Sequence, residues 1–118
     1  MNRDPRAKGK PLRGIFVIVP TPFDEDLAVD YGALDRINEF CVKSGSHGVV
    51  TPANASEQPM LTDAERQRII RRTVAQVNGR IPVVAGISSV SAYAAAENAR
   101  MACAEGADAL MAMPPYLV

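Results

Sequence analysis

The sequence predicts a parallel α/β protein in which strands and helices alternate as β-α-β-α-β-α-β. In the first apolar run, "GIFVIVPTPF" (14–23), residues 15–19 do not alternate with polar residues, which is typical of a strand buried on both faces. Segments with the apolar spacing of helices separate this run from the later ones. The predicted strands begin near residues 15, 49, 82 and 109, so each strand–helix unit is roughly 30 residues long, a usual size.

The first strand should end at Pro20 and Pro22, because proline has no N–H group to donate to a sheet. Asp30 is the expected N-cap of the first helix, and Gly45 is its expected stop. Between them, apolar residues recur on one helical face: Leu34, Ile37 and Cys41, with Phe40 beside them.

The second strand is predicted at 48–51, and Thr62 and Glu65 form a capping box that opens the next helix. The apolar face of this helix has five members: Ile69, Ile70, Thr73, Val74 and Val77. Four arginines cover the rest and indicate a solvated helix face rather than an anion site: Arg66, Arg68, Arg71 and Arg72. Asn78 and Gly79 should end the helix.

The third strand is predicted at 81–86. Ser91 should cap the third helix, which runs through an alanine-rich stretch and ends at Gly106. A fourth strand is predicted at 109–113, and the chain stops after "PPYLV".

Composition excludes several classes of partner. Lysine plus arginine and aspartate plus glutamate number 13 each, so nothing indicates nucleic acid or an acidic membrane as a partner. No apolar run approaches the roughly 18 residues that cross a bilayer. Residues 1–13 hold five basic residues and one acidic residue without apolar periodicity, and are expected to form a flexible basic arm.

The residues most often used in metal sites are few. Cys41 and Cys103 have no second cysteine or histidine at metal spacing, so both are expected to be buried free thiols, which fits a cytoplasmic protein. The single histidine, His47, precedes the second strand and is expected to have a structural or surface role. No metal site is predicted.

Two architectures fit the alternation. Eight units of about 30 residues would give the usual size of a (β/α)8 barrel, so residues 14–118 would be the N-terminal half of one, truncated after strand four. A doubly wound sheet would normally have a fifth strand. In both, ligands bind at the C-terminal ends of the strands, which carry residues 20–23, 51–58, 86–90 and 113–117.

The strand ends carry few chemical signals. No G-x-G-x-x-G or Walker motif follows a strand. Glu57 is the main ionisable group there, and bracing a loop or a helix start explains it better than general-base chemistry. None of the lysines Lys8, Lys10 and Lys43 lies on a strand, where burial would suit a Schiff-base lysine.

Five segments, in this order and spacing, carry a resemblance to a known family: "GIFVIVPTPFDED", "YGALDRINEFCVKSGSHGVV", "SEQPMLTDAERQRII", "GRIPVVAG" and "ACAEGADALMAMPPYL". From Gly14 onward the chain resembles the dihydrodipicolinate synthase / N-acetylneuraminate lyase family. The resemblance implies an aldolase-type (β/α)8 TIM barrel and a homotetramer built from tight dimers. It also implies class I aldolase or lyase chemistry, in which a lysine on strand six forms a Schiff base with pyruvate or another 2-oxo acid, without metal or organic cofactor.

The family's signature after strand two is Gly-Thr-Thr-Gly-Glu, which holds the carboxylate of the 2-oxo acid and supplies a threonine to a proton relay. The corresponding residues here are Ala53-Asn54-Ala55-Ser56-Glu57. The resemblance therefore implies substrate binding by Asn54, Ala55, Ser56 and Glu57. Asn54 stands at a relay position, where an amide can donate a hydrogen bond but cannot relay a proton as a hydroxyl does.

The family's strand-four motif is Pro-Tyr-Tyr, whose second tyrosine completes the relay in the neighbouring subunit. Counting without gaps places Tyr116 at the first tyrosine and Leu117 at the second, and a slip of one residue reverses this. Tyr116 is thus the second candidate catalytic residue. The strand-five tyrosine and strand-six lysine of the family lie beyond residue 118.

The favoured hypothesis is a fragment of a Schiff-base lyase or aldolase with a changed substrate, inactive by itself because it lacks the lysine. The departures at Asn54, Ala55 and Leu117 motivate an alternative, a non-catalytic or regulatory barrel protein. A complete small α/β binding module is the third hypothesis.

Overall fold

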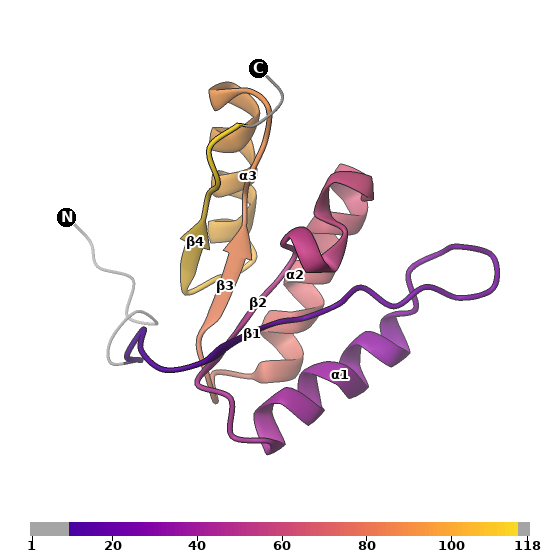
Figure 1. The fold of residues 1–118 in the computed structure, drawn as a ribbon, viewed down its shortest axis with the longest axis vertical. Coiled ribbons are helices and arrows are strands. Elements are labelled where there is room, and N and C mark those ends of the chain that lie inside the picture. The colour runs from indigo at the N-terminus through magenta and orange to yellow at the C-terminus, as the bar shows by residue number, and fades with distance from the viewer. Residues whose placement is uncertain (1–9, 116–118) are drawn as a thin grey trace.

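A computed structural model describes residues 10–115 of the chain, and its four strands form one parallel sheet in the order β1-β2-β3-β4 (Figure 1). The predicted alternation is confirmed, with these bounds: β1 (Phe16–Ile18), α1 (Tyr31–Lys43), β2 (Gly48–Val50), α2 (Asp63–Val77), β3 (Val83–Gly86), α3 (Ala92–Ala104) and β4 (Ala109–Met111). Two short 3-10 turns follow β2, η2 (Asn54–Ser56) and η3 (Gln58–Met60). All four strands therefore present their C-terminal ends at the same edge.

The core lies between one face of the sheet and the helices. Val49 of β2 and Val83 of β3 are paired in register, and both pack with Leu34 of α1 and Ile69 of α2. A second cluster joins β3 to α2 and α3 through Ile70, Ala85 and Ala102, all fully buried.

The prediction that residues 15–19 are buried on both faces is wrong. Val19 is fully buried, whereas Ile15 and Ile18 are 72% and 41% exposed. Successive side chains of a strand point to opposite faces, and Ile18 pairs with Val50 on the face that no helix of the described residues covers. Ile18 lies on an edge strand, whereas its partner Val50 on the same face, in the next strand, is only 6% exposed.

The predicted helix caps are confirmed. Oδ1 of Asp30 accepts a hydrogen bond from the Ala33 N–H at 2.9 Å, and Thr62 and Glu65 make both bonds of a capping box. Ser91 caps α3 in the same way, and Asn78 ends α2 in the left-handed conformation (φ 49°). N–H groups in the first turn of a helix have no acceptor within the helix, and here one in each helix donates to the side chain of the capping residue three positions earlier.

At the N-terminal edge of the sheet, His47 has the structural role expected of it. Its Nδ1 accepts a hydrogen bond from the Ile15 N–H at 3.0 Å. Its ring fills the space beside Gly14, where a Cβ atom would lie 2.3 Å from the histidine Cγ. Lys10 of the predicted arm pairs with Asp108 at 3.1 Å; residues 1–9 of the arm lie outside the described part.

At the C-terminal edge, the chain after β2 crosses the end of β3 in direct backbone contact. A Cβ atom on Gly86 would lie 1.8 Å from the carbonyl oxygen of Pro52, so only glycine fits there. This contact brings the segment 51–62 over the sheet.

We expect Gly86→Ala to lower the free energy of unfolding of the intact protein by about 1–3 kcal/mol, because the backbone of Pro52 would have to move. Gly32→Ala is the matched control. A Cβ on Gly32 in α1 meets Oδ1 of Asp30 at 3.4 Å, an ordinary contact, so about 0.4–1 kcal/mol of stabilisation is expected. Urea unfolding measures both, and equal effects of the two substitutions would contradict the close approach of Pro52 to Gly86.

Candidate functional site

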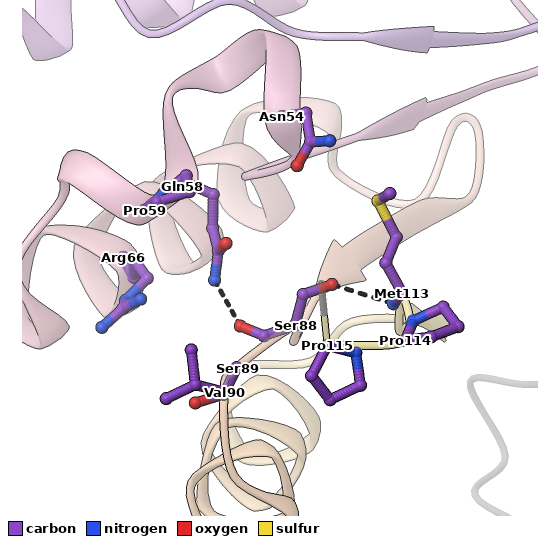
Figure 2. A pocket seen from close by; sticks show the side chains of 10 residues that line it. All are labelled: Asn54, Gln58, Pro59, Arg66, Ser88, Ser89, Val90, Met113, Pro114 and Pro115. Atoms are coloured by element: carbon purple, nitrogen blue, oxygen red, sulfur yellow. Dashed lines mark hydrogen bonds between the residues drawn. The ribbon is translucent and has the colours of Figure 1, made fainter. Parts of the chain in front are cut away.

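The segments that follow β2, β3 and β4 converge on a pocket of about 270 Å3 at the C-terminal edge of the sheet (Figure 2). Asn54 and Gln58 line it from the segment after β2, and Ser88 lines it from the segment after β3. Met113 and the prolines behind it contribute the wall from the β4 side. Ligand sites of parallel α/β folds lie at this edge, as the sequence predicted.

Two tight turns shape the segment after β2. The carbonyl of Ala53 accepts hydrogen bonds from the N–H groups of Ser56 (3.0 Å) and Gln58 (3.1 Å). Glu57 joins the two turns in the left-handed conformation, with φ 58°. This path turns the side chains of Asn54 and Gln58 toward the pocket.

Ser56, predicted to bind substrate, points elsewhere. It is fully buried, and its hydroxyl donates a hydrogen bond to the carbonyl of Val19. Its own carbonyl accepts from the hydroxyl of Thr21 at 2.6 Å. These two hydrogen bonds connect the segment after β2 to the residues that follow β1. The hydroxyl of Ser56 is therefore not directed at the pocket.

The other predicted site residues are distributed unevenly. Asn54 is exposed and lines the pocket, whereas Ala55 and Glu57 are exposed outside its lining. Tyr116 lies outside the described residues, so its place in a site stays a prediction.

Sequence reasoning missed Gln58 and Ser88. Gln58 is 4% exposed, and its side-chain Nε2 donates a hydrogen bond to the Ser88 carbonyl at 2.8 Å. The Ser88 hydroxyl accepts from the Met113 N–H at 2.9 Å. The sequence marks 86–90 as a strand-end loop, but nothing in it distinguishes Ser88 from Ser89.

The arginines of α2 are more than a solvated face. Arg71 makes two hydrogen bonds of 2.8 Å to Glu105, and Arg72 binds Asp35 of α1 at 3.0 and 2.6 Å. Arg66 lines the pocket and pairs with Asp63. The side chains of Arg71 and Arg72 are 63% and 41% exposed, so the expected exposed face is confirmed for them. In addition, the arginines tie α2 to its neighbours or border the pocket.

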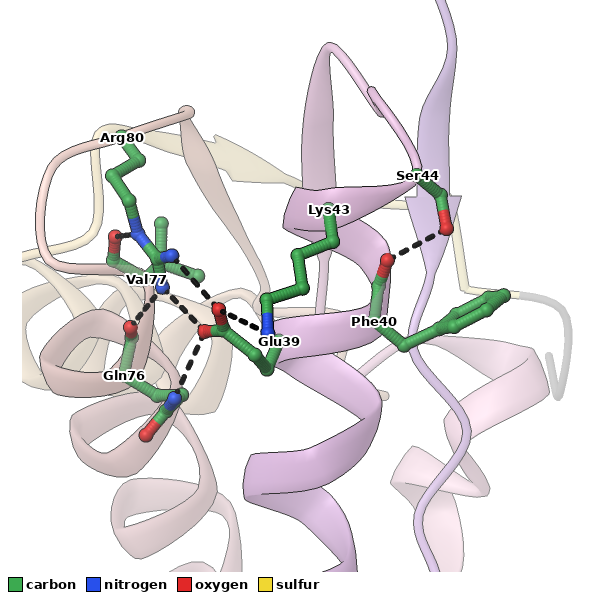
Figure 3. A network of polar contacts seen from close by, with 7 residues as sticks. All are labelled: Glu39, Phe40, Lys43, Ser44, Gln76, Val77 and Arg80. Atoms are coloured by element: carbon green, nitrogen blue, oxygen red, sulfur yellow. Dashed lines mark hydrogen bonds and ion pairs between the residues drawn. The ribbon is translucent and has the colours of Figure 1, made fainter.

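Glu39 of α1 is the acceptor in a further tie between α1 and the end of α2 (Figure 3). Arg80 donates to its two carboxylate oxygens at 3.1 and 2.7 Å, and Gln76 adds a bond of 3.2 Å. The hydrogen bonds from Arg80 hold the pKa of Glu39 at about 2, below its ordinary value of 4.5. This pair stabilises the arrangement of the helices that support the sheet and lies outside the pocket.

The two cysteines differ in environment. Cys41 is buried in the core, where loss of hydration raises the pKa of its thiol. Cys103 is exposed, so the prediction of burial is wrong for it. The buried face of α3 is carried by its neighbour Ala102, and the next residue along a helix points about a quarter-turn away.

Among residues 10–115, no helix is long and apolar enough to cross a membrane. The same residues contain no group of three or more His, Cys, Asp or Glu side chains placed to hold a metal ion.

A sheet whose parallel strands follow chain order, with helices on one face and polar segments gathered at the C-terminal edge, defines part of an aldolase-type (β/α)8 barrel. A family model described as "Dihydrodipicolinate synthetase family" matches residues 11–118. The chain belongs to this family, as the resemblance predicted.

Similar proteins cover nearly all of this chain. The 4-hydroxy-tetrahydrodipicolinate synthase of Sorangium cellulosum is 41% identical over 107 residues, which are 90% of this chain and 36% of that protein. The enzyme of the same name from Methylobacterium radiotolerans is 38% identical, over 92% of this chain and 36% of its own length. The crystal structure of dihydrodipicolinate synthase from Aquifex aeolicus matches with a TM-score of 0.86 and 33% identity, covering 89% of this chain and 36% of that one. This chain thus spans little more than a third of the length of these relatives.

A carboxyl group whose pKa is lowered by folding stabilises a protein above its unfolded pKa, and this contribution is lost as the pH falls through the folded pKa. We therefore expect Glu39→Gln to destabilise the intact protein at neutral pH. The difference from the unchanged protein should shrink as the pH falls from about 4.5 toward about 2. Urea unfolding over this pH range measures it.

The control for this experiment is the same substitution in an Arg80→Gln background. There, most of the pH-dependent difference should vanish, because the main donor to Glu39 is gone. A pH-dependent difference that persists in this background would show that another group lowers the pKa of Glu39.

Proposed function

We propose that this chain forms the first four strands of a class I aldolase or lyase that makes a Schiff base with pyruvate or a related 2-oxo acid. The observation that supports this most is the place of its signature segment. The resemblance implies that residues 53–57 correspond to the family's carboxylate-binding signature, and they lie at the C-terminal edge of a sheet with the family's fold. The lysine that forms the Schiff base would come from a part of the barrel that this chain does not contain.

Asn54 would bind the carboxylate of the 2-oxo acid. Its amide group lines the pocket and can donate a hydrogen bond to a carboxylate oxygen, a charge-assisted bond stronger than a neutral one. The protonated imine would then act as an electron sink, so that a C–C bond beside it can be made or broken. This proposal requires no metal or organic cofactor, and it includes a homotetramer in the cytoplasm.

The substrate or the proton relay should differ from that of the relatives. Asn54 and Ala55 replace the threonines of the signature, so this segment offers no hydroxyl at those positions. Ser56 has a hydroxyl, but that group is buried against Val19 and cannot substitute for them. A relay would therefore have to rely on other groups, of which Tyr116 is the candidate within this chain.

The same observation favours a second candidate function, a barrel protein that binds a 2-oxo acid without turning it over. The pocket and its amide donors would persist in such a protein while the relay is absent. The two functions differ in one testable respect, the formation of a covalent imine.

Reduction with borohydride in the presence of pyruvate tests the proposal on the intact protein expressed from its own gene. Mass spectrometry should detect one added group of the mass of reduced pyruvate. Peptide mapping should place it outside residues 1–118, because Lys10 and Lys43 lie off the strands and Lys8 lies in the N-terminal segment that the sequence predicts to be an arm. Lactate, which has no ketone, is the matched control and should give no adduct. The absence of an adduct with pyruvate and with a series of larger 2-oxo acids would reject the enzyme and favour the binding protein.

A further inference from the structure

The segment that leads into β1, residues 10–15, runs along the N-terminal edge of the sheet. Lys10 at its start pairs with Asp108, which directly precedes β4, and Ile15 at its end is bonded to His47, which directly precedes β2. Because the strands lie in the order β1-β2-β3-β4, the residues between these two contacts pass the start of β3. Figure 1 shows the indigo start of the described chain on the β4 side of β1.

The contact at the β4 end is made to a carboxylate that is built into the sheet. The Lys10 ammonium group lies 3.2 and 3.1 Å from the two carboxylate oxygens of Asp108, whose side chain is only 12% exposed. One of these oxygens, Oδ2, also accepts a hydrogen bond from the Val83 N–H at 2.9 Å, and the Asp108 N–H donates to the Val83 carbonyl at 2.9 Å. Lys10 therefore binds an acceptor whose position is fixed by β3.

The contact at the β2 end consists of two hydrogen bonds beside a glycine. The Ile15 N–H donates to Nδ1 of His47, and the Ile15 carbonyl accepts from the His47 N–H, both at 3.0 Å. Gly14 has a φ of 96°, a conformation that favours glycine, and the His47 ring occupies the space that a Cβ atom would need. The chain can therefore turn at Gly14 from the edge of the sheet into β1.

In a closed barrel, a segment on this path crosses an opening. Strands one and four of an eight-stranded barrel are three steps apart around the circle, so a segment that joins their N-terminal ends spans much of the N-terminal opening. Leu12 lies in the middle of this segment and is 61% exposed among the described residues. An apolar side chain at this place is suited to cover the end of a barrel interior, which is filled by apolar side chains.

We propose that residues 10–14 form a strap that closes the N-terminal opening of the barrel, with the ion pair of Lys10 and Asp108 as its latch. Leu12 packs in the intact protein against interior side chains at the N-terminal ends of strands five to eight. The strap leaves the C-terminal end open, where the pocket lies. This inference rests on the barrel fold and not on the Schiff-base chemistry.

A double-mutant cycle on the intact protein tests the latch. Lys10→Met removes the charge, and Asp108→Asn removes the charge but keeps an oxygen that can accept from Val83. We expect the double variant to raise the unfolding equilibrium constant by about three- to tenfold less than the product of the two separate effects, as measured by urea unfolding. Lys43→Met is the matched control. Lys43 pairs with Glu39 at 3.7 Å but is 75% exposed, so a change of about twofold or less is expected.

A pair of leucine substitutions in the intact protein tests the closure. Leu12→Ser should raise the unfolding equilibrium constant by about ten- to a hundredfold, the cost of returning a buried leucine side chain to water. Leu27→Ser is the matched control, because Leu27 is 81% exposed in the loop after β1 and should give about a twofold change or less.

The outcomes separate the strap from the proposed function. Equal effects of Leu12→Ser and Leu27→Ser would overturn the closure, and independent effects of Lys10→Met and Asp108→Asn would overturn the latch. Borohydride trapping with pyruvate should not change in these variants, because the pocket lies at the opposite edge of the sheet. An unchanged protein that gives no trapped adduct would reject the Schiff-base function and leave the strap standing.

Discussion

The pocket depends on one backbone contact, in which the carbonyl oxygen of Pro52 lies against Gly86. Any side chain on Gly86 would place a Cβ atom 1.8 Å from that oxygen. The segment after β2 can cross the end of β3 only because this space is empty. The crossing brings the Gln58 side chain within hydrogen-bond distance of the Ser88 carbonyl. The Ser88 hydroxyl in turn accepts a hydrogen bond from the N–H of Met113, which follows β4. The lining of the pocket by three consecutive segments results from this one close approach.

The barrel of the family explains the apolar surface that this part of the chain leaves uncovered. Ile18 lies on the face of the sheet away from the helices, which in a (β/α)8 barrel is the packed interior. Leu110 of β4, 40% exposed, pairs with the buried Ala85 and so lies on the helix-facing side. No helix of the described residues covers it there. Both residues are apolar because the complete architecture buries them, and not because of contacts within residues 10–115.

Local chemistry was predictable from the sequence, whereas contacts between distant residues were not. Asp30, Thr62 and Ser91 cap helices through bonds that span three residues, so their roles can be inferred from the nearby sequence. Ser56 and Gln58 are neighbouring polar residues, yet one binds a residue 37 positions earlier and the other a residue 30 positions later. Only the crossing at Gly86 and the left-handed turn at Glu57 decide which of them faces the pocket. The sequence predicted the place of the site for this reason, but it indicated neither the bond from the Ser56 hydroxyl to Val19 nor the place of Gln58 in the pocket.

These contacts also bear on how a site with the altered signature would work under the proposed function. The amide of Asn54 can donate a hydrogen bond to a carboxylate but cannot relay a proton. The one hydroxyl in residues 53–57 belongs to Ser56, and it is bonded to the carbonyl of Val19. Proton transfer must then depend on groups delivered by other segments. The bonds from Gln58 and from Met113 to Ser88 join the segments after β2, β3 and β4, so they fix the lining of the pocket into which such groups would have to reach.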